Sequence, residues 1–179
     1  MLFRSELEQR LKSIASEING LTRTQVEIST VKIVKRHTAD FKGKTWVTRK
    51  RPFIDRIASA WLIRKFIDKK AIFGFIDENE IKTLDKDAII FDMVDGEFTH
   101  VGELCTFEVL LKSFGLKDKA LVVIAEIVHQ LDLQDGKYRN PTAEGLRDIL
   151  NGIRKTVNDD HEAIEKGMSI FEMLYASNS

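Results

Sequence analysis

The order of elements between residues 45 and 92 constrains the fold more than any other part of the chain. In Thr45–Thr48 a tryptophan and a valine stand between two threonines, and such aromatic and β-branched residues favour a half-buried strand. Short apolar runs follow at 71–76 and 88–92, each with the length of a buried strand. A helical pattern at 52–66 separates the first two runs. The order strand, helix, strand predicts a crossover between parallel strands.

The helical pattern in this block has a clear start and a clear apolar face. Pro52 suits the first turn of a helix, which needs no N–H there, and the Asp55 carboxylate complements the positive end of the helix dipole. Apolar side chains recur at three- and four-residue steps: Ile54, Ile57, Ala58, Trp61, Leu62 and Phe66. We therefore expect an amphipathic helix that begins near Pro52 and packs on a core.

The second half of the chain predicts helices and no further strong strand. Helical spacing recurs in four segments, 103–114, 118–133, 142–154 and 159–175. The predicted fold class is therefore α+β. It has a small, mostly parallel sheet with strands near 45–48, 71–76 and 88–92, packed with helices and followed by a helical C-terminal half.

The chain divides into a short N-terminal part and one domain. Apolar residues at helical spacing predict a surface helix at 4–17, and the polar, basic residues up to Lys44 form an arm. We therefore expect an N-terminal helix and arm at 1–44 and a domain at 45–179. The whole chain has 179 residues, which suits one hydrophobic core.

Charge and composition limit the partners and the compartment. With 28 basic and 28 acidic residues the net charge is +0, whereas a DNA-binding surface needs an excess of cations. We therefore do not expect DNA as the first partner, although a local patch of basic residues would still allow DNA binding. The single cysteine, Cys105, excludes an internal disulfide and indicates a reducing cytoplasm, and no apolar run is long enough for a membrane span. The sequence leaves open whether the chain forms a homo-oligomer.

Histidines next to carboxylates indicate a metal site. His100 and Glu103 are three residues apart, as are His129 and Asp132. On a helix the second pair shares one face, which Glu126 extends, so this face would form half of a site and the His100 loop the other half. Imidazole and carboxylate ligands suit a divalent Mn, Fe, Zn or Ni ion.

A third histidine lies near the start of the last helix. The predicted ligands are His100, Glu103, His129, Asp132 and His161, and further ligands or bases are Glu108, Glu126 and Asp160. The alternative for each histidine is a hydrogen-bonded or surface residue, and an aspartate before the last helix could serve as its N-cap.

The basic turn before the Pro52 helix is a candidate anion site. Free N–H groups at a helix start and fixed guanidinium groups recognise tetrahedral oxyanions, which makes Arg49, Arg51 and Arg56 candidate ligands. The alternative is a solvated basic turn with weak surface ion pairs. Cys105 has a similar pair of interpretations, a reactive thiol at a helix start or a small buried residue.

Several blocks in the same order resemble the C-terminal domain of the chromate resistance protein ChrB. The matching blocks are Trp46–Arg49, Asp55–Ala58, Trp61–Arg64, Phe66–Asp68, His100–Glu108, Ile127–His129, Asp132–Leu133, Asp135–Lys137 and Asp159–Glu162. The resemblance covers about 45–176. Full-length members carry a further N-terminal domain, whereas only residues 1–44 precede the match here, so we do not expect their DNA-binding role to extend to this chain.

The resemblance and the residues together suggest three functions. The first is a cytoplasmic, metal-binding sensor or accessory protein in the stress response to chromate or another oxyanion. The second is a metal-dependent enzyme that acts on an anionic substrate held by Arg49, Arg51 and Arg56. The third is a DNA-binding transcriptional regulator whose arm contacts phosphates. The sequence does not decide whether the chain is an enzyme.

Overall fold

The computed structural model describes Arg10 and residues 33–179. The helix predicted at 4–17 lies outside the described residues except for Arg10. Residues 33–179 form one compact unit, which includes the last part of the predicted arm. Within this unit the Arg36 N–H donates to the Ser113 carbonyl at 2.9 Å, and the Phe41 side chain lies in the core.

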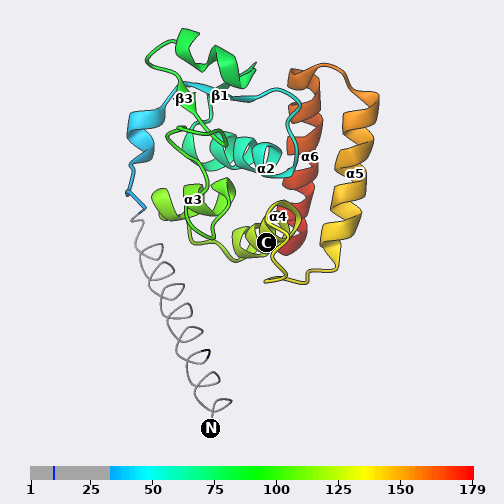
Figure 1. Cartoon of the computed structure of the whole chain (residues 1–179). Coiled ribbons are helices and arrows are strands. Elements are labelled where there is room, and N and C mark those ends of the chain that lie inside the picture. The colour runs from blue at the N-terminus through cyan, green and yellow to red at the C-terminus, as the bar shows by residue number, and fades with distance from the viewer. Residues whose placement is uncertain (1–9, 11–32) are drawn as a thin grey trace. The chain divides into compact units, whose positions relative to one another are not determined.

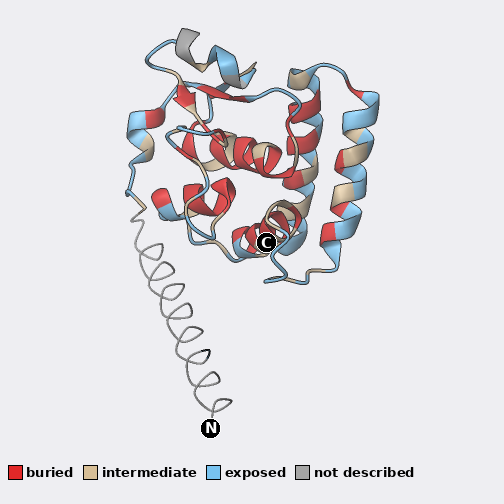
Figure 2. Cartoon of the chain, viewed as in Figure 1, coloured by how far each residue is buried: buried red, intermediate tan, exposed pale blue. Residues whose placement is uncertain are grey.

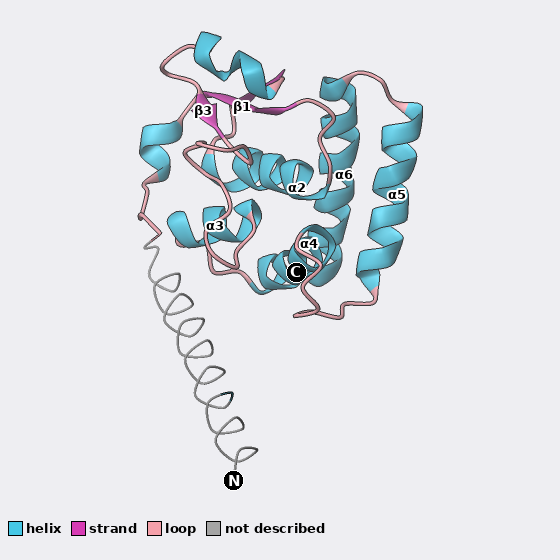
Figure 3. Ribbon diagram, viewed as in Figure 1, coloured by secondary structure: helices cyan, strands magenta, loops and turns pink. Residues whose placement is uncertain are grey.

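The sheet has three parallel strands, as predicted. They are β1 (Thr45–Arg49), β2 (Ile72–Ile76) and β3 (Ile89–Ile90), in the order β2-β1-β3. Trp46 in the central strand is paired with Phe73 on one side and Ile89 on the other. The sheet covers one end of a mostly helical unit (Figure 3). Because the strands are parallel, the carboxyl ends of all three point in one direction.

Helix α2 (Ile54–Leu62) is the crossover between β1 and β2, and its last turn continues as a π-helical turn, η2 (Ile63–Ile67). It begins two residues later than predicted, because Arg51 has a positive φ of 57° and Phe53 is an extended N-cap. Pro52 therefore belongs to the turn before the helix. The expected apolar face is buried in the core.

Four helices form the second half of the chain, which confirms the predicted α+β class. They are α3 (Thr106–Ser113), α4 (Lys119–Asp132), α5 (Thr142–Thr156) and α6 (Asp160–Asn178). Two short 3-10 turns are η1 (Thr38–Phe41) and η3 (Glu78–Thr83). Helix α3 begins three residues later than expected, because Val101 and Leu104 pair in a tight turn before it. Helices α5 and α6 lie side by side, and α6 lies between α5 and α2 (Figure 1).

Helix α2 lies in the middle of the unit. Trp61 stacks on Phe171 of α6 with ring centroids 6.2 Å apart, while Trp46 stacks on Phe98 at 5.8 Å beneath the sheet. Buried residues cover nearly all of α2, whereas the outer face of α5 is exposed (Figure 2). Among the described residues no helix is both long and apolar enough to span a membrane. Because α2 is buried nearly all round, its polar residues Asp55 and Ser59 are buried too.

Two helical glycines give opposite predictions for stability. A methyl group at Gly167 of α6 would overlap the Ile57 side chain of α2, whereas one at Gly152 of α5 would meet open space. We expect Gly167→Ala to lower the free energy of unfolding by about 1–3 kcal/mol through overpacking. Gly152→Ala should raise it by about 0.5–1 kcal/mol, since alanine favours helix. Urea denaturation of both variants tests the close contact of α2 and α6, and equal effects would contradict it.

Candidate functional site

Three carboxylates surround one imidazole nitrogen. The Nε2 atom of His100 lies 3.2 Å from Asp55 Oδ2, 3.3 Å from Asp92 Oδ1 and 3.2 Å from Asp132 Oδ2. We call these four residues the His100 cluster. One N–H can donate a well-aligned hydrogen bond to only one acceptor, so the three oxygens exceed what the proton of His100 requires.

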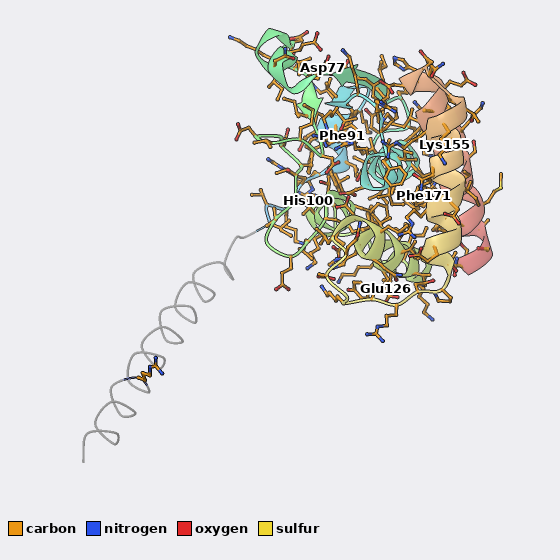
Figure 4. All side chains as sticks on the ribbon, turned by 45° about the vertical axis from the view of Figure 1, so that its right-hand side comes forward. Asp77, Phe91, His100, Glu126, Lys155 and Phe171 are labelled. Carbon is orange, nitrogen blue, oxygen red and sulfur yellow. The ribbon has the colours of Figure 1, made fainter. Side chains whose placement is uncertain are left out.

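The cluster forms where four separate segments meet. Asp55 lies in the first turn of α2, and Asp92 follows β3, where a positive φ of 49° turns the chain. His100 lies on the loop before α3 (Figure 4), and Asp132 is the last residue of α4. Asp55 and Asp92 both follow parallel strands, β1 and β3, and the carboxyl ends of parallel strands are the usual place for a ligand.

Asp55 has a second role within the fold. Its carboxylate accepts hydrogen bonds from the Thr106 N–H at 2.7 Å and the Phe107 N–H at 2.9 Å, the first two free donors of α3. The side chain is 2% exposed, and burial raises the pKa of Asp55 to about 6. The residue therefore fixes the start of α3 against the start of α2.

Asp92 links the cluster to an arginine. The Nε atom of Arg56 lies 3.1 Å from Asp92 Oδ2, and the Thr106 hydroxyl donates to Asp92 Oδ1 at 2.8 Å. Burial alone would raise the pKa of Asp92, but the hydrogen bond with His100 and the Arg56 charge hold this pKa below its usual value. The Arg56 side chain is 14% exposed, so this ion pair is shielded from solvent.

The charges of this region favour a cation. Hydrogen bonds to Asp132, Asp55 and Asp92 raise the pKa of His100 to about 12, so His100 carries a proton near neutral pH. Even so, three carboxylates face two cations, His100 and Arg56. A divalent ion that replaced the proton of His100 would leave the imidazole neutral. The two charges of the ion and the charge of Arg56 would then balance the three carboxylates.

The distances also fit a metal. Bonds of about 2.0–2.2 Å to one ion place neighbouring ligand atoms about 2.8–3.6 Å apart, from octahedral to tetrahedral geometry. The separations at His100 Nε2 lie in this range. Asp55, His100 and Asp132 each offer one ligand atom, and these atoms lie within 4.8 Å of one another. These three residues could therefore hold one ion, with Asp92 beside them.

His129 lies in a neighbouring cluster of its own. Its Nδ1 is 2.7 Å from Glu108 Oε2, its Nε2 is 3.1 Å from Asp135 Oδ2, and the Tyr138 ring packs edge-on against it. The imidazole is fully buried. Since both nitrogens face carboxylates, His129 is directed away from the His100 cluster, although it lies one turn before Asp132.

The structure separates the predicted ligands into several places. It brings His100 and Asp132 together and pairs His129 with Glu108. The His161 ring packs against Phe75, with centroids 4.9 Å apart. Glu103 and Glu126 lie outside the group of ligand atoms that converge among the described residues, and Asp160 accepts the backbone N–H of Arg51 at 2.9 Å. Metal binding itself stays a prediction.

Sequence reasoning did not assign Asp55 and Asp92 to the metal site. The sequence pattern predicts a partner of the helix dipole at Asp55 and places Asp92 only at the end of an apolar run. The available signal was the position of each aspartate shortly after a predicted parallel strand, where side chains from distant segments meet.

The basic turn is only partly directed at this site. The Lys50 ammonium lies 2.6 Å from Asp77 and so forms a surface ion pair. Burial lowers the pKa of Arg56, the charge of Asp92 opposes this effect, and the charge of Arg49 adds to it. Arg56 is the member that contacts the His100 cluster directly, through Asp92.

Cys105 is a small core residue. It is fully buried, and burial raises the pKa of its thiol well above the usual range. A thiol of this kind is not a nucleophile near neutral pH.

The comparisons with known proteins point to one family. The model of the ChrB C-terminal domain matches residues 46–178. Protein ChrB of Cupriavidus metallidurans is 35% identical over 144 residues, which cover 80% of this chain and 43% of that protein. The chain therefore spans less than half the length of this relative. No solved structure matches the chain.

Proposed function

The chain belongs to the ChrB C-terminal domain family, and from this premise we propose that it is a metal-binding sensor or accessory protein in chromate or oxyanion resistance. One observation carries the proposal: three carboxylate oxygens converge on His100 Nε2 at 3.2–3.3 Å. In this proposal Asp55, His100 and Asp132 bind one divalent ion. The protein acts in the cytoplasm.

The donor set favours some of the candidate metals over others. Aspartates outnumber the imidazole, and no thiolate takes part, because Cys105 is buried and protonated. Oxygen and imidazole donors suit Mn or Fe, and Zn or Ni are also compatible. An ion here would offer its remaining coordination positions to an anion, with Arg56 close by through its ion pair with Asp92.

A second candidate is a metal-dependent enzyme that acts on an anionic substrate. Its support is the exposure of the His100 side chain, which is 39%, because this exposure leaves one side of the cluster open to a substrate. A bound ion would supply Lewis-acid polarisation there. Turnover by the metal-loaded protein would distinguish this candidate from a sensor.

Metal content of purified variants tests the proposal. We expect about one transition-metal ion per chain in the native protein and a loss of at least about 90% in His100→Ala and Asp132→Asn, since removal of one protein ligand weakens such sites strongly. Inductively coupled plasma mass spectrometry gives the stoichiometry. His161→Ala is the matched control, because His161 packs on Phe75 outside the cluster.

Two results would contradict the proposal. Full metal content in His100→Ala would exclude the His100 cluster, and loss of metal in His161→Ala would move the site elsewhere. With the same preparations, calorimetric titration of the loaded protein with chromate and sulfate tests the oxyanion part. Equal and negligible heats would remove it and leave metal binding in place.

A further inference from the structure

A pocket of about 310 Å³ lies between α3 and α4, apart from the His100 cluster. Its walls are mainly apolar and include Leu111, Leu116, Val122, Ala125 and the Tyr138 ring. This volume lies at the small end of the range for sites that bind small molecules, which are mostly apolar with a few polar groups. The pocket therefore has room for a molecule with one ring.

A buried carboxylate provides the polar group at the inner wall. The Glu108 side chain is 10% exposed, and its Oε2 accepts the Cys105 N–H at 3.1 Å and contacts His129 Nδ1 at 2.7 Å. Its other oxygen, Oε1, makes no hydrogen bond to any residue that the structure describes. Among the described residues Oε1 is not one of the buried side-chain atoms that lack a partner, so it reaches solvent in the pocket and can accept a hydrogen bond from an O–H or N–H group of a ligand.

Lysines give the opening of the pocket the opposite charge. Lys35, Lys112 and Lys117 line it and are exposed, against one carboxylate there, Glu126. The Lys35 ammonium donates to the Lys112 carbonyl at 2.6 Å, which holds it beside α3. Glu126 lies on α4 at the lower side of the unit (Figure 4). The excess of ammonium groups favours an anionic group at this end.

We infer that this pocket binds a small amphipathic acid, with a hydrogen-bond donor directed at Glu108 Oε1, an apolar ring between the walls and an anionic group at the lysines. The three features come from separate observations: the partnerless oxygen, the apolar walls and the basic opening. Binding here needs neither the metal nor the oxyanion of the proposed function.

Three probes separate the contributions of donor and charge. 4-Hydroxyphenylacetate has both groups, phenylacetate lacks the hydroxyl, and 2-(4-hydroxyphenyl)ethanol lacks the carboxylate. In calorimetric titrations we expect the first to bind best and each of the others to bind at least about tenfold more weakly, as the loss of one charged hydrogen bond predicts. Equal affinities for all three probes, or no binding of the first, would overturn the inference.

A variant at the opening locates the binding. Val122 lines the pocket and is 55% exposed, so Val122→Trp should block the opening without disturbing the core and abolish binding of 4-hydroxyphenylacetate. Ile149→Trp is the matched control, because Ile149 is similarly exposed on α5, and it should bind as the native protein does. Unchanged binding in Val122→Trp would contradict this location. Metal content is expected to stay the same in both variants, which separates this test from that of the metal site.

Discussion

Replacement of Asp55 by alanine is expected to lower the free energy of unfolding by about 3–5 kcal/mol, because it removes a buried charged partner. The backbone N–H groups of Thr106 and Phe107 would lose their acceptor at the start of α3. His100 would lose one of three carboxylates, and the proposed ion one ligand. Urea denaturation of the metal-free protein, followed by tryptophan fluorescence, measures the loss of stability.

Two further variants make the result specific to Asp55. Asp148→Ala removes an exposed aspartate of α5 and should change stability little. Asp55→Asn keeps the shape and one oxygen acceptor, so we expect it to be more stable than Asp55→Ala while still binding metal poorly. A cost for Asp55→Ala as small as that for Asp148→Ala would contradict the role of Asp55 as the cap of α3.

The dual role of Asp55 couples the proposed site to the fold. Because the same carboxylate caps α3 and faces His100, a ligand that binds only the folded His100 cluster would also stabilise the α2–α3 contact. Asp92 extends this coupling to the sheet, since it follows β3 and pairs with Arg56 of α2. The proposed site and the packing of α2, α3 and β3 therefore depend on the same residues.

The sheet and most helices could be predicted because their signals are local. The period of apolar residues predicts strands near 45–48 and 71–76 and helices at 118–133, 142–154 and 159–175. These bounds lie within three residues of the observed ends of β1, β2, α4, α5 and α6. The start of α2 was wrong by two residues, because the left-handed turn at Arg51 places Pro52 before the helix. Backbone conformations of this kind depend on contacts that a sequence pattern does not carry.

The candidate site was predicted only in part, for a related reason. Sequence spacing favours partners three residues apart, such as Glu103 for His100, whereas the observed partners of His100 are separated from it by up to 45 residues. The same limit applies to His129. Its place one turn from Asp132 was correctly expected, but Glu108 of α3 reaches its ring from another helix. Tertiary packing decides which carboxylate meets which imidazole.

Replacement of Asp68 by alanine is expected to cost about 3–5 kcal/mol of unfolding free energy, since several donors lose a buried charged acceptor together. The carboxylate accepts from the N–H groups of Gly43 at 2.8 Å, Lys44 at 2.9 Å and Lys70 at 3.1 Å, and from Trp46 Nε1 at 3.2 Å. It thereby joins the end of η2 to the start of β1, and the residue is 2% exposed.

The effect of Asp68 should depend on pH in one direction. Burial alone would raise the pKa of Asp68, but the hydrogen bonds from Gly43, Lys44 and Trp46 lower it. A pKa lower in the folded than in the unfolded state adds stability above the unfolded pKa of about 4, which is lost as the pH falls through the folded pKa. The stability gap between the native protein and Asp68→Ala should therefore be large at pH 7 and smaller at pH 3 in urea denaturation. Asp85→Ala is the control, because the Asp85 carboxylate accepts one local hydrogen bond, from the Asp87 N–H, and this variant should show little gap at either pH. A gap for Asp68→Ala that is the same at pH 7 and pH 3 would contradict the charged network.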